Sequence, residues 1–142
     1  MRGLLRLGTL AWPLAAALST GCAEELGPER WQTTRVTGVV TEGKKPVGRG
    51  WIEFLPADGT VGTMRSAPLG PDGRFEAVGV AVGTNRIGVA GAPIGNREFR
   101  RLFDPLGSPI RRTITKATAV DGLKIDLLDE YALWSSTRPA DP

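Results

Sequence analysis

The sequence predicts an all-β fold, a small antiparallel β-sandwich of about seven strands, preceded by a signal peptide and a short tether. Three observations support this prediction. The chain has 142 residues, which is room for one ordinary domain. Its 19 glycines and 11 prolines favour short strands and turns over long helices. Beyond residue 31, apolar and polar residues alternate in short runs, with turn signals about every ten residues.

The composition excludes several familiar catalytic and metal sites. The chain has no histidine, and Cys22 is its single cysteine. Metal centres built from histidine and cysteine, Ser-His-Asp triads and Cys-His dyads therefore cannot be assembled. We expect a non-catalytic protein that carries no metal and no cofactor.

The first 21 residues have the pattern of an export signal. Arg2 and Arg6 lie in a short basic region, and residues 7–18 follow without a charge. A helix that spans a bilayer needs about 20 apolar residues, so this stretch is too short for a lasting membrane span. We expect residues 1–21 to be a signal peptide that is removed from the mature chain.

The end of this signal, Leu18-Ser19-Thr20-Gly21-Cys22, resembles the lipobox of bacterial lipoproteins. In that family the cysteine becomes the first mature residue and carries a lipid, and small residues precede it. Ser19 stands where the family usually has leucine. The resemblance implies that Cys22 is lipidated and anchors the protein to a membrane of the cell envelope, on its periplasmic or outer face. The alternative is an ordinary secretory signal cut after Ala15-Ala16-Ala17.

Residues 22–30 are polar, contain a Gly-Pro pair and show no periodicity, so we interpret them as a tether. From Cys22 onward the chain has 16 basic and 15 acidic residues, because Arg2 and Arg6 of the 18 basic residues belong to the signal. This near-neutral balance does not favour binding of nucleic acid through bulk charge.

We predict the sandwich over residues 31–134 and identify its strands by period-two alternation. In the first strand, Val36 and Val40 alternate with polar neighbours, and a Gly-Lys-Lys-Pro turn leads to the strand of residues 51–55. We interpret these two strands as a hairpin. Residues 61–69 then have the character of a weaker edge strand.

The second half of the domain begins with a strong turn signal, Gly70-Pro71-Asp72-Gly73. Phe75 and Ala77 alternate with charged residues in the strand that follows, and residues 86–90 form another strand. The last strand is predicted over residues 123–127.

One stretch, residues 96–103, interrupts the alternation and has apolar residues at helical spacing. We interpret it as one or two helical turns in a connection between the two sheets. Residues 135–142, rich in Pro, Ser and Asp, are expected to be a disordered tail. The residues predicted to face the core are Val36, Val40, Ile52, Phe54, Phe75, Ile87, Val89, Leu123, Ile125 and Leu127.

Together these patterns resemble the carboxypeptidase regulatory-like, transthyretin-like β-sandwich of many bacterial envelope lipoproteins. The opening strand of residues 36–40, the turn of residues 43–47 and the strand that ends at Pro56 match the opening pattern of that family. Asp72-Gly73-Arg74-Phe75 matches its Asp-Gly turn before a phenylalanine, whereas the tyrosine that the family has in a later strand is missing from residues 83–89.

A subgroup of small lipoproteins has an aromatic residue with Asp-Pro, then Ser-Pro, before a final strand. Phe103-Asp104-Pro105, Ser108-Pro109 and residues 125–127 stand in that order. The resemblance covers residues 34–128 and implies the sandwich fold. It implies no peptidase activity, because this module is a non-catalytic appendage of the enzyme, and folds of this kind serve many functions.

The strongest candidate for a binding surface is a group of arginines around the irregular connection. They are Arg97, Arg100, Arg101, Arg111 and Arg112. Such a patch is suited to an anionic polymer, to lipid head groups or to an acidic protein. The alternative is a solvated charged face without a ligand.

Three other groups of residues have weaker functional interpretations. Aspartates in predicted turns are expected to bond nearby backbone, with calcium binding as the alternative: Asp58, Asp72, Asp104 and Asp121. Acid–base or nucleophilic roles are disfavoured without a histidine for Asp126, Asp129, Glu130, Ser66 and Ser108. Three tryptophans are expected to cover the core, although an exposed trio would indicate a carbohydrate site: Trp31, Trp51 and Trp134.

The sequence thus predicts a lipid-anchored envelope module with a structural or protein-interaction role. The alternative is an envelope binding protein for carbohydrate or an anionic ligand. Its expected partners are the membrane and an envelope protein or polysaccharide. A concave pocket would favour a small ligand, and a flat sheet face or an open edge would favour a protein.

Overall fold

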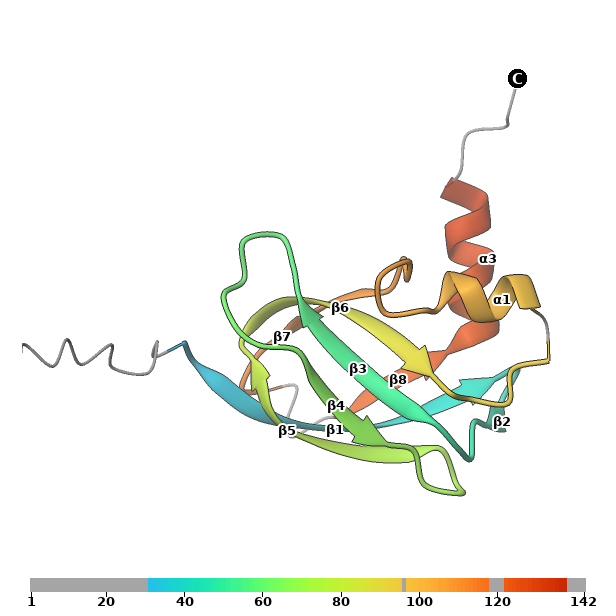
Figure 1. The fold of residues 1–142 in the computed structure, drawn as a ribbon, viewed down its shortest axis with the longest axis horizontal. Helices are drawn as coiled ribbons and strands as arrows, with labels where there is room; N and C mark the ends of the chain where they lie inside the picture. The colour runs from blue at the N-terminus through green and yellow to red at the C-terminus, as the bar shows by residue number, and fades with distance from the viewer. Residues whose placement is uncertain (1–30, 96, 118–121, 138–142) are drawn as a thin grey trace, which may run out of the picture.

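The computed structural model describes residues 31–95, 97–117 and 122–137, which form two packed β-sheets with two helices at one end (Figure 1). In this part of the chain, the first sheet contains β1 (Thr33–Glu42), β2 (Lys45–Pro46), β5 (Arg74–Ala81) and β8 (Leu123–Asp126). The second sheet has the order β4 (Arg65–Pro68), β3 (Trp51–Pro56), β6 (Gly83–Ala90) and β7 (Arg111–Ile114). The predicted all-β sandwich is confirmed.

Strand β1 is the centre of the first sheet. It pairs antiparallel with β5 and with β2, and it pairs in parallel with β8, where Gly38 lies opposite Leu123. The parallel pair departs from the predicted antiparallel arrangement. It forms because the chain between β7 and β8 crosses from the second sheet back to the first, and such a crossover permits parallel pairing.

The predicted hairpin between the strands now identified as β1 and β3 is wrong, because these strands lie in different sheets. β1 forms its hairpin with the two-residue strand β2. The turn between them has positive φ at Gly43 (58°) and Lys44 (68°), which is typical of a two-residue hairpin connection. The chain then crosses to the second sheet, where β3 pairs with β4 and β6.

The predicted edge strand is confirmed in position but is shorter than expected. β4 lies at the edge of the second sheet and begins at Arg65, so residues 57–64 form a loop. The predicted helical turns are present as α1 (Arg97–Leu102). They do not connect the two sheets, however, because α1 links β6 to β7 within the second sheet.

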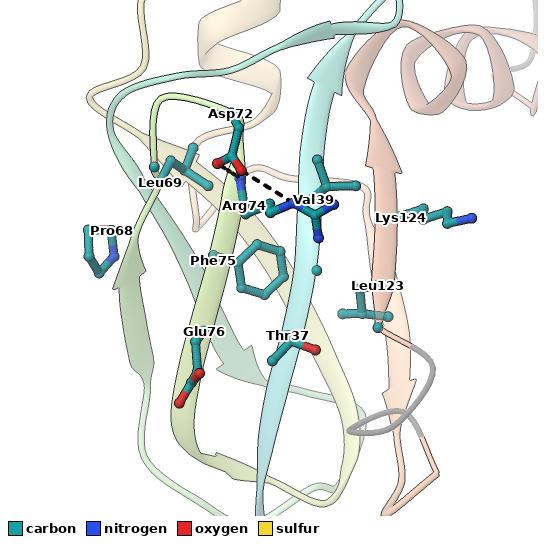
Figure 2. A pocket seen from close by; sticks show the side chains of 13 residues that line it. Thr37, Val39, Pro68, Leu69, Asp72, Arg74, Phe75, Glu76, Leu123 and Lys124 are labelled. Carbon is teal, nitrogen blue, oxygen red and sulfur yellow. Dashed lines mark hydrogen bonds and ion pairs between the residues drawn. The ribbon is translucent and has the colours of Figure 1, made fainter.

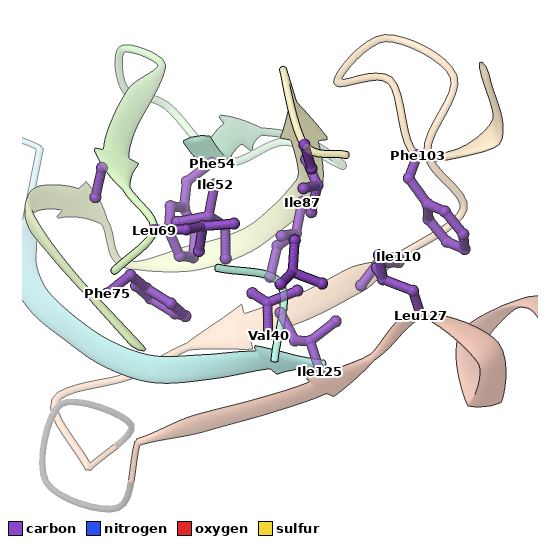
Figure 3. Packing of buried hydrophobic residues seen from close by; sticks show 14 of the residues in the cluster. Val40, Ile52, Phe54, Leu69, Phe75, Ile87, Phe103, Ile110, Ile125 and Leu127 are labelled. Atoms are coloured by element: carbon purple, nitrogen blue, oxygen red, sulfur yellow. The ribbon is translucent and has the colours of Figure 1, made fainter. Parts of the chain in front are cut away.

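The core lies between the two sheets (Figure 3). Every predicted core residue is buried except Leu123, which is half-buried and packs against the core. The rings of Phe54 and Phe75 meet with centroids 5.9 Å apart. Gly38 makes room for this arrangement, since a Cβ atom there would lie 2.7 Å from the Phe75 ring and 2.3 Å from the carbonyl oxygen of Leu123.

The chain after β8 is helical. The predicted last strand ends at Asp126, one residue early, and α3 (Leu127–Thr137) follows. Leu127 is fully buried, and the ring of Tyr131 lies 5.3 Å from that of Phe99 in α1, centroid to centroid. The first three residues of the tail that was expected to be disordered, 135–137, belong to this helix, and residues 138–142 lie outside the described part.

Candidate functional site

The candidate lipidation residue, Cys22, lies outside the described residues, as do the signal peptide of residues 1–21 and the tether of residues 22–30. The structure shows where the chain enters the sandwich. β1 begins at Thr33, at the end of the molecule opposite to α1 and α3 (Figure 1). The predicted anchor and the helices are therefore attached to opposite ends of the domain.

The five arginines of the candidate patch fall into two groups. Arg97, Arg100 and Arg101 lie on α1, and Arg111 and Arg112 lie on β7. The antiparallel pairing of β7 places Arg111 beside Arg86 of β6. The sequence brings all five close along the chain, but the structure divides them between a helix and a strand.

The two arginines of β7 have carboxylate partners. Arg111 Nε lies 3.2 Å from Asp58 Oδ2, and both side chains are exposed. Arg112 pairs through its guanidinium with Glu130 of α3, whose side chain is only 13% exposed, and it also donates to the carbonyl oxygen of Arg111. The second pair joins β7 to α3, so Arg112 serves the fold, and Arg111 is engaged in an exposed ion pair.

The arginines of α1 form fewer interactions with other described residues than those of β7 do. Arg100 donates to the carbonyl oxygen of Ile94 at 3.0 Å. Arg97 and Arg101 are exposed, and neither forms an ion pair with a side chain in the described part of the chain. The basic surface that stays available is therefore the α1 arginine group of Arg97, Arg100 and Arg101.

Asp126 is a structural carboxylate. Its oxygens accept hydrogen bonds from the Thr41 hydroxyl (2.8 Å) and from the backbone N–H groups of Gly43 (3.0 Å), Lys44 (2.7 Å) and Leu128 (3.0 Å). Burial alone would raise the pKa of Asp126, but the bonds from Lys44, Thr41, Gly43 and Leu128 outweigh it and lower the pKa to about 2. The carboxylate is therefore committed to the β1–β2 turn and the start of α3.

The other residues considered for acid–base or nucleophilic roles do not gather around Asp126. Glu130 is held by Arg112, and Asp129 is exposed on the first turn of α3. Ser108 is buried and accepts the N–H of Ile110 at 3.2 Å. Ser66 is exposed on the edge strand β4. Each of these side chains has its own local environment, and no two of them form a catalytic pair.

Two of the turn aspartates, Asp72 and Asp104, bond nearby backbone as their positions predicted, whereas Asp58 bonds a side chain that is distant in the sequence. Asp72 accepts the N–H of Arg74 at 3.1 Å, and Asp104 accepts the N–H of Leu106 at 3.1 Å. Asp58 pairs with Arg111. Asp121 lies outside the described residues. Within residues 31–95, 97–117 and 122–137, no group of three or more metal-binding side chains is present.

The three tryptophans do not form one surface. Trp31 is half-buried beside the entry to β1, where Gly62 of the β3–β4 loop approaches it. Trp51 is 49% exposed at the start of β3, and Trp134 is half-buried on α3. Because β3 runs between the two ends of the sandwich, Trp31 and Trp51 lie at opposite ends. The condition set for a carbohydrate platform, an exposed trio, is not met.

A groove of about 860 Å³ crosses the first sheet between β5 and β8 (Figure 2). Figure 2 shows Thr37 on β1, Arg74 and Glu76 on β5, and Lys124 on β8. Arg74 pairs with Asp72 at 3.3 Å and Glu76 with Arg35 at 3.1 Å, so the arginine and the glutamate of the groove both have partners of opposite charge. Alternation along the sequence could not reveal this groove, since it depends on β8 lying beside β1.

Comparison of the chain with protein-family models, with curated proteins and with solved structures finds no match. Among the described residues, no helix combines the length and the apolar character needed to cross a bilayer.

Proposed function

We propose that this chain is a lipid-anchored, non-catalytic β-sandwich module of the cell envelope, with a structural or protein-interaction role. The observation that carries the proposal is the lipobox-like sequence that ends at Cys22, placed directly before a folded sandwich. A two-sheet β-sandwich is also the fold that the resemblance to the carboxypeptidase regulatory-like family implies.

The geometry supports a protein held close to its membrane. Eleven peptide links separate Cys22 from Thr33, where β1 begins, and a chain of this length reaches at most about 36–40 Å. A non-catalytic role is supported by the use of the acidic side chains. Asp126 holds a turn and a helix start, and Glu130 holds Arg112.

Metabolic labelling with a fatty acid tests the anchor. The full chain, expressed in a bacterial host, is expected to incorporate the label and to fractionate with membranes. Cys22→Ser should abolish both, whereas Ser19→Leu, which supplies the usual lipobox leucine, should leave both intact. Equal labelling of the Cys22→Ser chain and the unmodified chain would exclude lipidation at this residue.

A second candidate function is the binding of an anionic envelope ligand by the α1 arginine group. The observation that favours it is the exposure of Arg97 and Arg101 on one short helix, without an ion pair to a described side chain. Loops and short helices that a rigid sandwich holds in place are common positions for binding residues. The groove on the first sheet is less suitable for an anion because its arginine is already paired with Asp72.

Retention on a dextran sulfate resin tests this candidate. Arg97→Ser combined with Arg101→Ser should lower the salt concentration that elutes the protein, because screening weakens exposed charge interactions. The matched control is Arg49→Ser with Lys116→Ser, which removes the same charge from exposed positions elsewhere. Equal effects of the two pairs would mean that only net charge matters.

A further inference from the structure

The end of the sandwich where the chain enters carries an uncharged, apolar loop. Residues 59–64 connect Asp58 to Arg65 without a charged side chain. Within this stretch Val61 is 62% exposed and Met64 is 51% exposed. Apolar side chains exposed together at a loop tip are typical of a surface that contacts a membrane or a partner.

This loop lies beside the start of β1. A Cβ atom on Gly62 would stand 2.6 Å from the Cβ of Ala81 and 3.7 Å from the ring of Trp31, so the loop folds directly over the chain entry. Figure 1 shows the same arrangement, with the β3–β4 loop and the start of β1 at one end and the two helices at the other. Trp31 adds a half-buried aromatic ring, the kind of side chain that favours the membrane–water interface.

The charges beside the loop are compatible with a membrane surface. Asp58 is paired with Arg111 at 3.2 Å, so its negative charge is compensated. Arg65 is turned back onto the domain, where its Nε donates to the carbonyl oxygen of Gly79 at 3.3 Å. Lys116, in the turn that follows β7, is exposed. No uncompensated acidic side chain among the described residues of the loop would oppose contact with anionic lipid.

The length of the tether favours one end of the sandwich at the bilayer. A flexible chain of ten residues, the number between Cys22 and Thr33, has a typical end-to-end distance of about 18 Å. The ten residues of β1 alone span about 33 Å, and the helices lie at its far end (Figure 1). An anchor at Cys22 therefore favours an orientation with the entry end near the membrane and with α1 and α3 farther from it.

We propose that the entry end of the sandwich seats on the lipid bilayer, with Val61 and Met64 of the β3–β4 loop placed among the lipid head groups beside Trp31. This inference rests on the proposed lipid anchor. It deepens that proposal by assigning an orientation: the loop faces the membrane, and the α1 arginine group faces the aqueous side, where an envelope partner can reach it.

The native tryptophans provide the test. The chain from Cys22 to Pro142, which contains every described residue, is coupled through the Cys22 thiol to a maleimide lipid in phosphatidylcholine vesicles. Three variants each retain one tryptophan, at position 31, 51 or 134, and the others are changed to phenylalanine. In vesicles with brominated acyl chains, Trp31 should lose fluorescence relative to ordinary vesicles, while Trp51 and Trp134 keep theirs.

Substitutions in the loop make the test specific. Val61→Ser with Met64→Ser should reduce the quenching of Trp31. Leu133→Ser on α3, whose side chain is 63% exposed and so matches Val61, should not. Far-UV circular dichroism checks that the variants are folded. If the loop variant does not fold, the comparison of the three single-tryptophan chains still decides the orientation.

Other outcomes would overturn the proposal. Absence of Trp31 quenching would mean that the domain stands off the bilayer, and quenching of Trp51 or Trp134 instead would mean that the helix end is seated. Undiminished Trp31 quenching in the loop variant would exclude Val61 and Met64 as the contact. Because the anchor is attached chemically, these results do not depend on lipidation in cells. Failure of the proposed function would instead appear as missing fatty-acid label on Cys22.

Discussion

At the scale of single residues, Asp126 joins three parts of the chain. It is the residue before α3, and its carboxylate accepts the N–H of Leu128, which is the geometry of a helix N-cap. The same carboxylate accepts two successive N–H groups in the β1–β2 turn, including that of Lys44, whose positive φ is unfavourable for a residue other than glycine. One side chain thus stabilises a strained turn and starts a helix.

Replacing this carboxylate should destabilise the protein. In Asp126→Asn the negative charge is lost. One acceptor oxygen is replaced by an amide NH2 group, which is itself a donor and faces backbone N–H donors. We expect the free energy of unfolding to fall by about 1–2 kcal/mol, the range found for N-caps and charge-assisted hydrogen bonds. Urea unfolding followed by circular dichroism measures it. Thr41→Val, which removes a single donor to Asp126, should cost less. A larger loss in Thr41→Val would contradict this ranking.

The lowered pKa of Asp126 predicts a dependence of stability on pH. The folded protein holds this pKa near 2, against an ordinary value of 3.8. A carboxyl group with a lowered pKa contributes its full stabilisation above the ordinary value and loses it as the pH falls towards the folded value. Between these pH values the unmodified chain should therefore lose more stability than Asp126→Asn. Urea unfolding at several pH values measures the free energy of unfolding of both proteins. If these free energies change equally with pH across that range, this role is refuted.

At the scale of elements, the sequence predicted strands better than their pairing. Alternation located Val36, Ile52, Phe75 and Ile125 correctly on the inner faces, because burial of one face imposes period two. The wrong hairpin has a physical cause. β2 has only two residues, which is too short to show alternation, so the sequence shows only a turn where the chain crosses between the sheets.

Helix α3 did carry a signal in the sequence. Asp126 followed three residues later by Asp129 resembles a capping box, and Glu130 adds a second acidic residue to the first turn. The alternation of residues 123–127 obscured it, since Leu127 continues the inward phase of β8 and is buried.

The sequence also could not show that two of the five arginines in the candidate patch have carboxylate partners. The partners of Arg111 and Arg112 are 53 and 18 residues away, so only the topology reveals them.

The two ion pairs of β7 should differ in their contributions to stability. The Glu130 side chain is 13% exposed and that of Arg112 is 33% exposed, whereas Asp58 and Arg111 are 54% and 41% exposed. Glu130→Ala leaves Arg112 partly buried without its partner, and we expect a loss of about 1–2 kcal/mol. Asp58→Ala should change stability by less than about 0.5 kcal/mol. A double-mutant cycle between Glu130 and Arg112 measures the pair itself, and a coupling energy near zero would contradict this assignment.

At the scale of the whole molecule, one core connects the two sheets and the helical segments. The buried cluster includes Val40 and Ile125 from the first sheet, Ile52 and Ile87 from the second, and Leu127 from α3 (Figure 3). Phe103, at the end of the α1 segment, belongs to the same cluster. A domain with a single core is expected to unfold in one cooperative step. The helices are therefore part of the folded unit, although they extend beyond the predicted strands.

This single core predicts which truncations the protein tolerates. A chain of residues 31–137 contains every side chain of the described cluster and should therefore unfold in urea at the same midpoint as residues 22–142. A chain that ends at Asp126 loses the fully buried Leu127, the Arg112–Glu130 pair and the helix that Asp126 caps. We expect it to be less stable by at least about 3 kcal/mol, the cost of deleting a buried leucine together with its neighbours. An unchanged midpoint for that shorter chain would mean that α3 is only an appendage. Two separate unfolding transitions in residues 31–137 would mean that the sheets do not share one core.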